Sequence, residues 1–315
     1  QTFKLQNGLK VVLCEEHSTP QVYGCVVVHA GSKNENPAAT GVAHYFEHIM
    51  FKGTDRIGTV NWNEEKLYLD SISHCYDQLR ATTDKRQREA IQQELNRLSA
   101  TASKYAIPNE VDAILQKMGC TGLNAGTSYD YTVYYNMLPS NQLSNWMDVY
   151  VERFRNPVFR LFQTELEAVY EEKNMGDDNL VSDFRDRMLQ SIYKGTGYSE
   201  NIVGTTENLK NPRLGQMREF FEKYYVASNM GLVLTGNIKA DEAMPVIEKK
   251  FGRIITWTRK CAEPIFKNST DLCLAELLTT IPGDQIIIYT FDEDFENQFK
   301  AALKTNIEIS KDDPP

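Results

Sequence analysis

The stretch QVYGCVVVHAGSKNENPAATGVAHYFEHIMFKGT (residues 21–54) joins a strand-like run to a helix-like run and contains two histidines four residues apart. Its first part is rich in β-branched residues as far as Gly31, which predicts a strand. The part from Asn36 onward predicts a loop that leads into a helix. Positions i and i+4 of a helix lie on one face, so His44 and His48 can both point at a single ion.

The pentapeptide His-x-x-Glu-His combines two possible metal ligands with a possible base. Zinc binds imidazole nitrogen readily, and catalytic zinc sites typically use three protein ligands plus water. Glu47 lies close to the same helix face, where a carboxylate can act as general base without binding the metal. This residue order is the inverzincin signature. The motif alone also fits a pair of surface or helix-capping histidines, and it needs a third ligand from elsewhere.

A third ligand is available in the acidic run RLFQTELEAVYEEKNM (residues 160–175), whose composition favours a helix. Glu165 and Glu172 are two helical turns apart and project from one face, with Val169 on the same stripe. Further glutamates make the whole segment acidic. A solvated charged face is therefore the alternative explanation for these two carboxylates.

The composition limits the classes of function. The 315 residues are 41% hydrophobic and 24% charged, as in ordinary soluble globular proteins. Acidic and basic residues are interspersed at a net charge of −9, which argues against nucleic-acid binding, since that needs a clustered basic face. No apolar run approaches the roughly 20 residues that span a bilayer. The six cysteines form no CxxC pair, so we expect buried free thiols.

The remaining segments predict a layered α/β (α+β) fold, a mostly antiparallel sheet covered by helices. Residues 3–16 suggest a strand, a turn at Asn7-Gly8 and a second strand. Residues 122–138 are read as one strand and residues 229–252 as strand, turn and helix. Apolar spacing over residues 59–105 predicts two amphipathic helices, either packed on their own domain or used as a docking arm for a partner.

Several motifs in a fixed order now support a family resemblance. HYFEH and ELEAVYEE are accompanied by LQNGLKVVLCEEHSTPQV, NAGTSYDYTVYY, YYVASNMGLVLTGNI and KKFG. Together they resemble the pitrilysin and insulin-degrading-enzyme family of zinc metallopeptidases, the inverzincins, and they are most similar to bacterial members. The match runs from about Thr2 to Gly252 and is interrupted by the helical segment.

The resemblance implies a zinc endopeptidase, a peptide hydrolase with one Zn²⁺ per chain. His44, His48 and Glu172 would be the metal ligands. Glu47 would take a proton from the attacking water and later deliver it to the leaving amine, while zinc polarises the scissile carbonyl. Glu165 would be a catalytic-site residue that supports the metal centre without binding the ion.

The resemblance also implies how a peptide substrate or small unfolded protein is held. NAGTS (residues 124–128) is similar to the family's edge strand, which binds an extended peptide by backbone hydrogen bonds. We expect backbone contacts at Asn124 and Ala125, with Gly126 and Thr127 completing the substrate-binding stretch. An ordinary turn that leads into a core strand is the alternative.

Family members enclose their substrate between two homologous halves, each of two similar domains. We therefore expect a catalytic domain over residues 1–252, with a helical insertion at about 59–106, and a linker with an incomplete or truncated second domain over 253–315. The implied partner is a second homologous half or a homo- or heterodimer partner. The alternative function is a non-catalytic or partner-dependent peptide-binding subunit. The bacterial resemblance suggests the periplasm or cell envelope, although the residues themselves do not determine the compartment.

Overall fold

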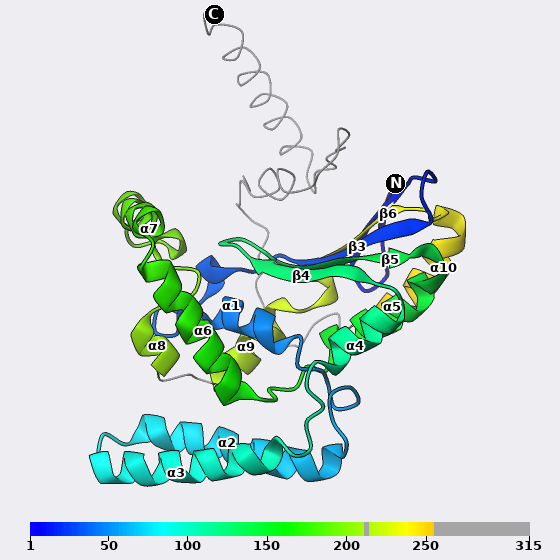
Figure 1. Cartoon of the computed structure of the whole chain (residues 1–315). Helices are drawn as coiled ribbons and strands as arrows, with labels where there is room; N and C mark the ends of the chain where they lie inside the picture. The colour runs from blue at the N-terminus through cyan, green and yellow to red at the C-terminus, as the bar shows by residue number, and fades with distance from the viewer. Residues whose placement is uncertain (211–213, 255–315) are drawn as a thin grey trace, which may run out of the picture. The chain divides into compact units, whose positions relative to one another are not determined.

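The computed structural model describes residues 1–210 and 214–254, and it forms one six-stranded sheet within that range. The strands follow the order β1-β2-β6-β3-β5-β4 across the sheet (Figure 1). Their bounds are β1 (Thr2–Lys4), β2 (Lys10–Glu15), β3 (Gln21–Val28), β4 (Thr121–Thr127), β5 (Thr132–Pro139) and β6 (Met230–Gly236).

Strand pairing in this sheet is mostly antiparallel. β2 pairs with β6 in parallel, and the other four pairings are antiparallel. The predicted fold class, a mostly antiparallel sheet covered by helices, is therefore confirmed. β4 is an edge strand because it pairs with β5 alone among the described strands, and this edge runs beside the helix that contains the two histidines (Figure 1).

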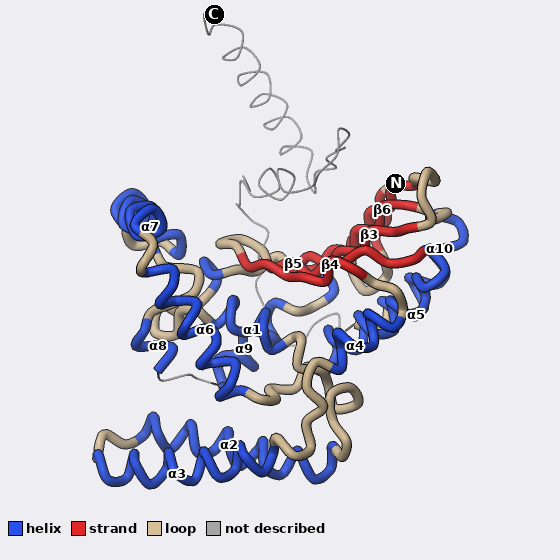
Figure 2. Tube along the Cα trace, viewed as in Figure 1, coloured by secondary structure: helices blue, strands red, loops and turns tan. Residues whose placement is uncertain are grey.

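Helices cover the sheet on the side that contains the core (Figure 2). Helices α1, α5, α9 and α10 lie on this side, and α6 runs alongside α1. The α-helices are α1 (Val42–Ile49), α2 (Trp62–Ala81), α3 (Lys85–Ala102), α4 (Glu110–Lys117), α5 (Leu143–Arg155), α6 (Phe162–Asp177), α7 (Leu180–Ile192), α8 (Thr206–Lys210), α9 (Leu214–Tyr224) and α10 (Ala240–Phe251). Short 3-10 turns cover Ser32–Asn34, Ser140–Gln142, Gly197–Ser199 and Ala227–Asn229.

The packing of α5 on the sheet depends on a glycine in β3. Trp146 of α5 is fully buried, and a Cβ at Gly24 would lie 2.6 Å from its ring. Asn136 of β5 accepts hydrogen bonds from Trp146 Nε1 and the Tyr150 hydroxyl, so both buried polar groups are satisfied. A larger residue at position 24 would force the helix away from the sheet.

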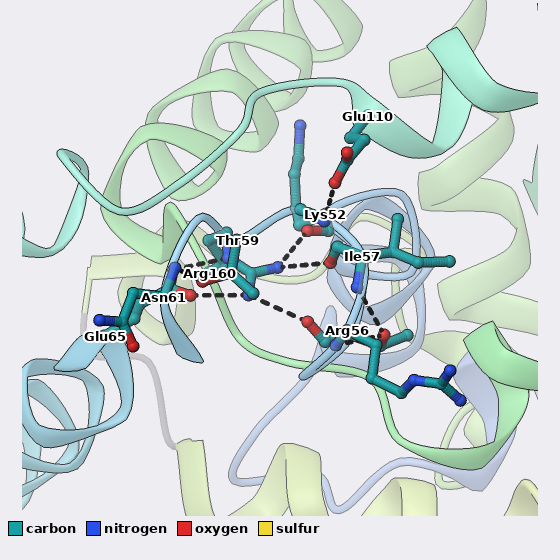
Figure 3. A network of polar contacts seen from close by, with 10 residues as sticks. Lys52, Arg56, Ile57, Thr59, Asn61, Glu65, Glu110 and Arg160 are labelled. Atoms are coloured by element: carbon teal, nitrogen blue, oxygen red, sulfur yellow. Dashed lines mark hydrogen bonds and ion pairs between the residues drawn. The ribbon is translucent and has the colours of Figure 1, made fainter. Parts of the chain in front are cut away.

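The predicted helical insertion forms an antiparallel hairpin of α2 and α3 that packs on its own domain. The ring of Tyr76 packs edge to face on Phe162, with 5.1 Å between centroids. At the base of the hairpin, Glu65 forms a buried ion pair with Arg160 (Figure 3). These contacts favour the first of the two expected roles, a hairpin docked on its own domain.

The interpretation of residues 122–138 as one strand is wrong. The segment is a hairpin, in which β4 and β5 are joined by a turn at residues 128–131. The turn is held from outside, since Asp130 accepts from the Tyr198 hydroxyl at 2.6 Å and pairs with Lys33. This tertiary contact cannot be read from local composition. The expectations for residues 255–315 lie outside the described residues.

Candidate metal centre

The first residue of helix α1 is set by contacts with Gly41 and Glu35. Gly41 precedes the helix with φ of 87°, and a Cβ there would lie 2.4 Å from the carbonyl oxygen of Val203. The Glu35 side chain accepts hydrogen bonds from the backbone N–H of Gly41 and of Ala43 at 2.7 and 2.6 Å. The Glu35 side chain thus satisfies two free N–H groups at the start of the helix, and burial raises its pKa to about 8. The start of α1, and so the rotation of its histidines, is fixed by these contacts.

Helix α6 lies beside α1 because apolar side chains seal the space between them. Val169 is fully buried, Phe162 is 4% exposed, and the Tyr45 hydroxyl donates to the Phe162 carbonyl. This packing turns Glu165 and Glu172 toward the histidines of α1. The sequence expectation of one shared helical face agrees with this arrangement.

The three predicted ligands are brought together. His44 Nε2 lies 3.5 Å from Glu172 Oε1, and His48 Nε2 lies 3.6 Å from Glu172 Oε2. Ligand atoms of all three residues lie within 4.8 Å of one another, the one such cluster found among the described residues. Two atoms that each lie about 2.1 Å from a tetrahedral zinc are about 3.4 Å apart. The donor set of two imidazoles and one carboxylate, at these separations, fits Zn²⁺.

Burial keeps the imidazole of His44 neutral. The residue is 8% exposed, and its Nδ1 has no hydrogen-bond partner among the described residues. Burial, together with the neighbouring His48, lowers the pKa of His44 to about 4. The ring is therefore neutral at pH 7, which is the form that binds a metal.

The Glu47 side chain points toward the edge strand β4. Its Oε2 accepts a hydrogen bond from the Thr127 hydroxyl at 2.6 Å, and the residue is 8% exposed. Burial raises the pKa of Glu47, and the nearby charge of Glu172 acts in the same direction, while the Thr127 hydroxyl and His48 oppose them. A raised carboxyl pKa suits a group that must accept a proton and then release it.

Glu165 lies behind His48 on the side away from Glu172. Its Oε2 is 3.6 Å from His48 Nδ1, and its Oε1 forms an ion pair with Lys52 Nζ at 2.7 Å. Burial opposes ionisation of Glu165, but His48 and Lys52 together lower its pKa. A carboxylate behind a ligating histidine is the usual partner of such a ring.

The cluster opens into a cleft of about 670 Å³ whose other wall is β4. All four predicted substrate-binding residues line it, namely Asn124, Ala125, Gly126 and Thr127. Sequence reasoning missed several further lining residues, which come from elements far apart in the chain: Phe51, Lys52, Asn109, Asp112, Tyr129 and Arg185. No local signal marks them, because only the fold brings α4, α7 and the loop after α1 to one cleft.

A mostly antiparallel sheet domain whose His-x-x-Glu-His helix faces a glutamate-bearing helix has the features expected of the inverzincin class of zinc metallopeptidases. Comparison with known families agrees. The model of the insulinase family (peptidase family M16) matches residues 10–88 and 94–206, and that of the peptidase M16 inactive domain matches residues 213–289. The chain belongs to the insulinase family, peptidase family M16, whose members include pitrilysin-like zinc metalloproteases.

Individual relatives are distant. The chain is 24% identical over 252 residues to an uncharacterized zinc protease, YmxG, of Bacillus subtilis, covering 79% of this chain and 49% of the relative. It is 23% identical over 262 residues to the probable zinc protease PqqL of Escherichia coli, covering 80% of this chain and 23% of that protein. It is also 21% identical to a mitochondrial-processing peptidase subunit beta of Dictyostelium discoideum, covering 79% of this chain and 43% of the relative.

Solved structures share the fold. A protease from Helicobacter pylori superposes with a TM-score of 0.64 at 20% identity, covering 84% of this chain and 52% of that one. The first half of the periplasmic protease PqqL from Escherichia coli gives 0.61 at 20% identity, covering 86% and 49%. The chain thus spans about half the length, or less, of the curated relatives it matches. None of the helices in residues 1–210 and 214–254 combines the length and the apolar composition that a membrane-spanning helix needs.

Proposed function

We propose that this chain is the catalytic half of a zinc endopeptidase that hydrolyses peptides or small unfolded proteins. The observation that supports this best is the meeting of His44, His48 and Glu172 at zinc-ligand separations, with Glu47 lining the same cleft. Neither surface histidines nor a solvated acidic helix would require this convergence of two helices. The non-catalytic alternative also fits the family, but it gives no reason for a complete ligand set with an adjacent base.

The chemistry divides among the residues in the following way. Zinc held by His44, His48 and Glu172 would supply Lewis acidity toward the scissile carbonyl. Glu47 would accept a proton from the attacking water and return it to the departing amine. Thr127 would hold the Glu47 carboxylate toward the cleft through its 2.6 Å hydrogen bond.

Substrate would add to the sheet as a further strand beside β4. An edge strand offers unpaired backbone N–H and C=O groups that bind an extended peptide with little regard to side chains. Asn124 and Ala125 would provide these contacts, with Gly126 and Thr127 continuing the same strand toward Glu47. Substrate peptides that are N-methylated opposite β4 should therefore bind more weakly than unmodified peptides of equal sequence.

We further propose that full activity needs a second homologous half, in the same longer polypeptide or in a dimer partner. Helix α7, whose Arg185 lines the cleft, leaves Leu180, Val181 and Phe184 at least 70% exposed. Apolar side chains exposed in a group indicate an interaction surface. The curated relatives are at least twice as long as the matched region, which favours a second half as the occupant. PqqL of Escherichia coli is a periplasmic protease, which supports a proposed periplasmic location for this chain.

The decisive test is zinc content with peptide cleavage. We expect one zinc per chain in the metal-replete protein and a sharp loss in Glu172→Gln, measured by elemental analysis. Glu171→Gln, one residue away on the same helix, is the matched control and should retain zinc. A replete parent without zinc would contradict the peptidase function and leave a peptide-binding role.

Cleavage of a quenched fluorescent peptide then separates the remaining possibilities. Activity of this chain alone would show that the second half is dispensable. Zinc binding without cleavage, followed by cleavage when the rest of a longer polypeptide or a partner is supplied, would support the two-half proposal. Zinc binding with no cleavage under either condition would favour the non-catalytic subunit.

A further inference from the structure

Lys52 follows helix α1, and its side chain extends toward Glu165 beside the predicted metal ligands. Its Nζ lies 2.7 Å from Glu165 Oε1, and the two side chains are only 13% and 15% exposed. Exposed ion pairs of this kind contribute little, because solvent screens them and both side chains lose freedom. This pair is mostly shielded from solvent and involves the one carboxylate that lies behind His48.

The contacts of Glu165 divide between its two oxygens. Oε1 contacts Lys52, while Oε2 lies 3.6 Å from His48 Nδ1. The other nitrogen of the same ring, Nε2, lies 3.6 Å from Glu172 Oε2 in the ligand cluster. Because the two nitrogens are on opposite sides of the imidazole, a carboxylate held at Nδ1 orients Nε2 toward the metal position.

The backbone of Lys52 is itself held from the far side. Arg160 Nη1 donates to the Lys52 carbonyl at 2.7 Å and to the Ile57 carbonyl at 3.2 Å (Figure 3). A Cβ at Gly58 would lie 2.7 Å from both Arg160 Nη1 and the Lys52 carbonyl oxygen, so this approach needs a glycine. Arg160 is also paired with Glu65 at the base of the helical insertion. The ammonium group of Lys52 therefore extends from a backbone that several elements immobilise.

We propose that Lys52 is a positioning residue for the metal ligand His48 and acts through Glu165. It holds the Glu165 carboxylate at His48 Nδ1, so that His48 presents Nε2 to the ion with little reorganisation. This inference rests on the proposed function only in taking zinc as the bound ion. It assigns Lys52 no contact with substrate, although the residue lines the cleft.

The test is the zinc dissociation constant, measured by chelator competition. Removal of an outer partner of a metal-binding histidine typically weakens metal binding about 10–100-fold. We expect a loss of that size in Lys52→Met and in Glu165→Gln. The double variant should be no weaker than Glu165→Gln alone, because both changes interrupt one chain of contacts. Lys52→Arg, which keeps the charge, should restore most of the affinity.

Lys173→Met is the matched control. Lys173 is 12% exposed and also lines the cleft, but it pairs with Asp177 and not with a carboxylate behind a ligand. We expect its zinc affinity to equal that of the parent. Thermal unfolding of the metal-free variants will show whether each one still folds, independently of zinc.

Three results would overturn the proposal. The first is parent-like zinc affinity in a folded Lys52→Met. The second is additive losses in the double variant, which would mean that Lys52 acts independently of Glu165. The third is a raised KM with unchanged zinc affinity, which would make Lys52 a substrate contact. A parent that binds zinc but cleaves nothing leaves this test intact, whereas a parent without zinc overturns this proposal and the proposed function together.

Discussion

Two clusters of ionisable groups flank the loop after α1, one of them buried and the other lining the cleft, and they differ in how completely the protein satisfies them. In the first, Arg160 donates to both carboxylate oxygens of Glu65 at 2.5 and 2.8 Å and to three backbone carbonyls. In the second, the histidine-to-carboxylate distances are 3.5 and 3.6 Å, and His44 Nδ1 has no partner among the described residues. The first cluster is saturated by the protein itself, and the second is not.

The difference separates a structural role from a functional one. Buried polar groups in folded proteins are nearly always hydrogen-bonded, because an unpaired group costs about 1–3 kcal/mol. The Glu65–Arg160 pair meets this requirement and joins the helical insertion to the domain. In the predicted ligand cluster, His44, His48 and Glu172 face one another at zinc-ligand spacing without forming hydrogen bonds among themselves. Burial alone therefore does not mark a site, whereas side chains that converge at metal-ligand spacing without hydrogen bonds between them do.

The largest expected effect is on the saturated cluster. Arg160→Leu leaves Glu65 buried without its cation, so we expect a loss of about 3–5 kcal/mol in the free energy of unfolding. Urea denaturation of the metal-free protein measures it. Arg56→Leu is the control, since Arg56 is 74% exposed, and we expect it to cost less than about 1 kcal/mol. Equal losses of stability in the two variants would mean that the buried Glu65–Arg160 pair contributes no more than an exposed arginine.

A comparable effect, but on rate instead of stability, is expected for Glu47→Gln. The amide cannot accept the proton, so kcat should fall about 10²–10⁴-fold while zinc content stays near one per chain. Steady-state cleavage of a quenched peptide and elemental analysis of the same sample measure both quantities. Loss of zinc in this variant would place Glu47 among the ligands and would contradict its assignment as base.

His44→Leu tests the unsaturated cluster directly. In the metal-free protein we expect the free energy of unfolding to stay the same or increase, because the variant removes a buried nitrogen that lacks a partner among the described residues. Zinc at a hundredfold excess over its dissociation constant should stabilise the parent by about 2.7 kcal/mol and the variant not at all. Thermal scans with and without zinc supply the comparison. A metal-free variant much less stable than the parent would mean that His44 has a structural role.

The smallest effect is expected at Thr127. Thr127→Val removes the hydroxyl that donates to Glu47, a hydrogen bond to an ionisable group worth about 1.5 kcal/mol, so kcat/KM should fall about 10-fold with zinc retained. Thr121→Val, at the far end of the same strand, is the control. A parent-like rate would show that Glu47 is held by other contacts.

Much of the site was accessible from periodicity and chemistry. The i, i+4 histidines, the adjacent glutamate and the two glutamates seven apart each followed from helix geometry, and the structure places all five residues in the lining of one cleft. Their assigned roles remain predictions. The interpretation of residues 122–138 failed because the turn between β4 and β5 is held by Asp130, Lys33 and Tyr198, which are distant in sequence.

The same limit applies to the helices that sequence reasoning overlooked, namely α4, α5, α7, α8 and α9. Which face of each helix is buried depends on the element that it packs against. Trp146 of α5, for example, is buried because Gly24 of β3 leaves space for its ring. Lys52 and Arg160 also carried no signal, because a lysine after a helix and an arginine before another are ordinary surface residues until the fold buries them.

The sequence by itself identified the candidate metal ligands and the family resemblance, since residue types, their helical spacing and the order of motifs are local properties of the chain. Only the tertiary structure decided which carboxylate faces which histidine, that β4 is an edge, and that Lys52 lies behind Glu165. Those facts depend on the packing of α1 against α6 and on the strand order of the sheet. The physical reason is that these interactions act over different distances along the sequence. Hydrogen-bonded periodicity acts over a few residues, whereas burial joins residues more than a hundred positions apart.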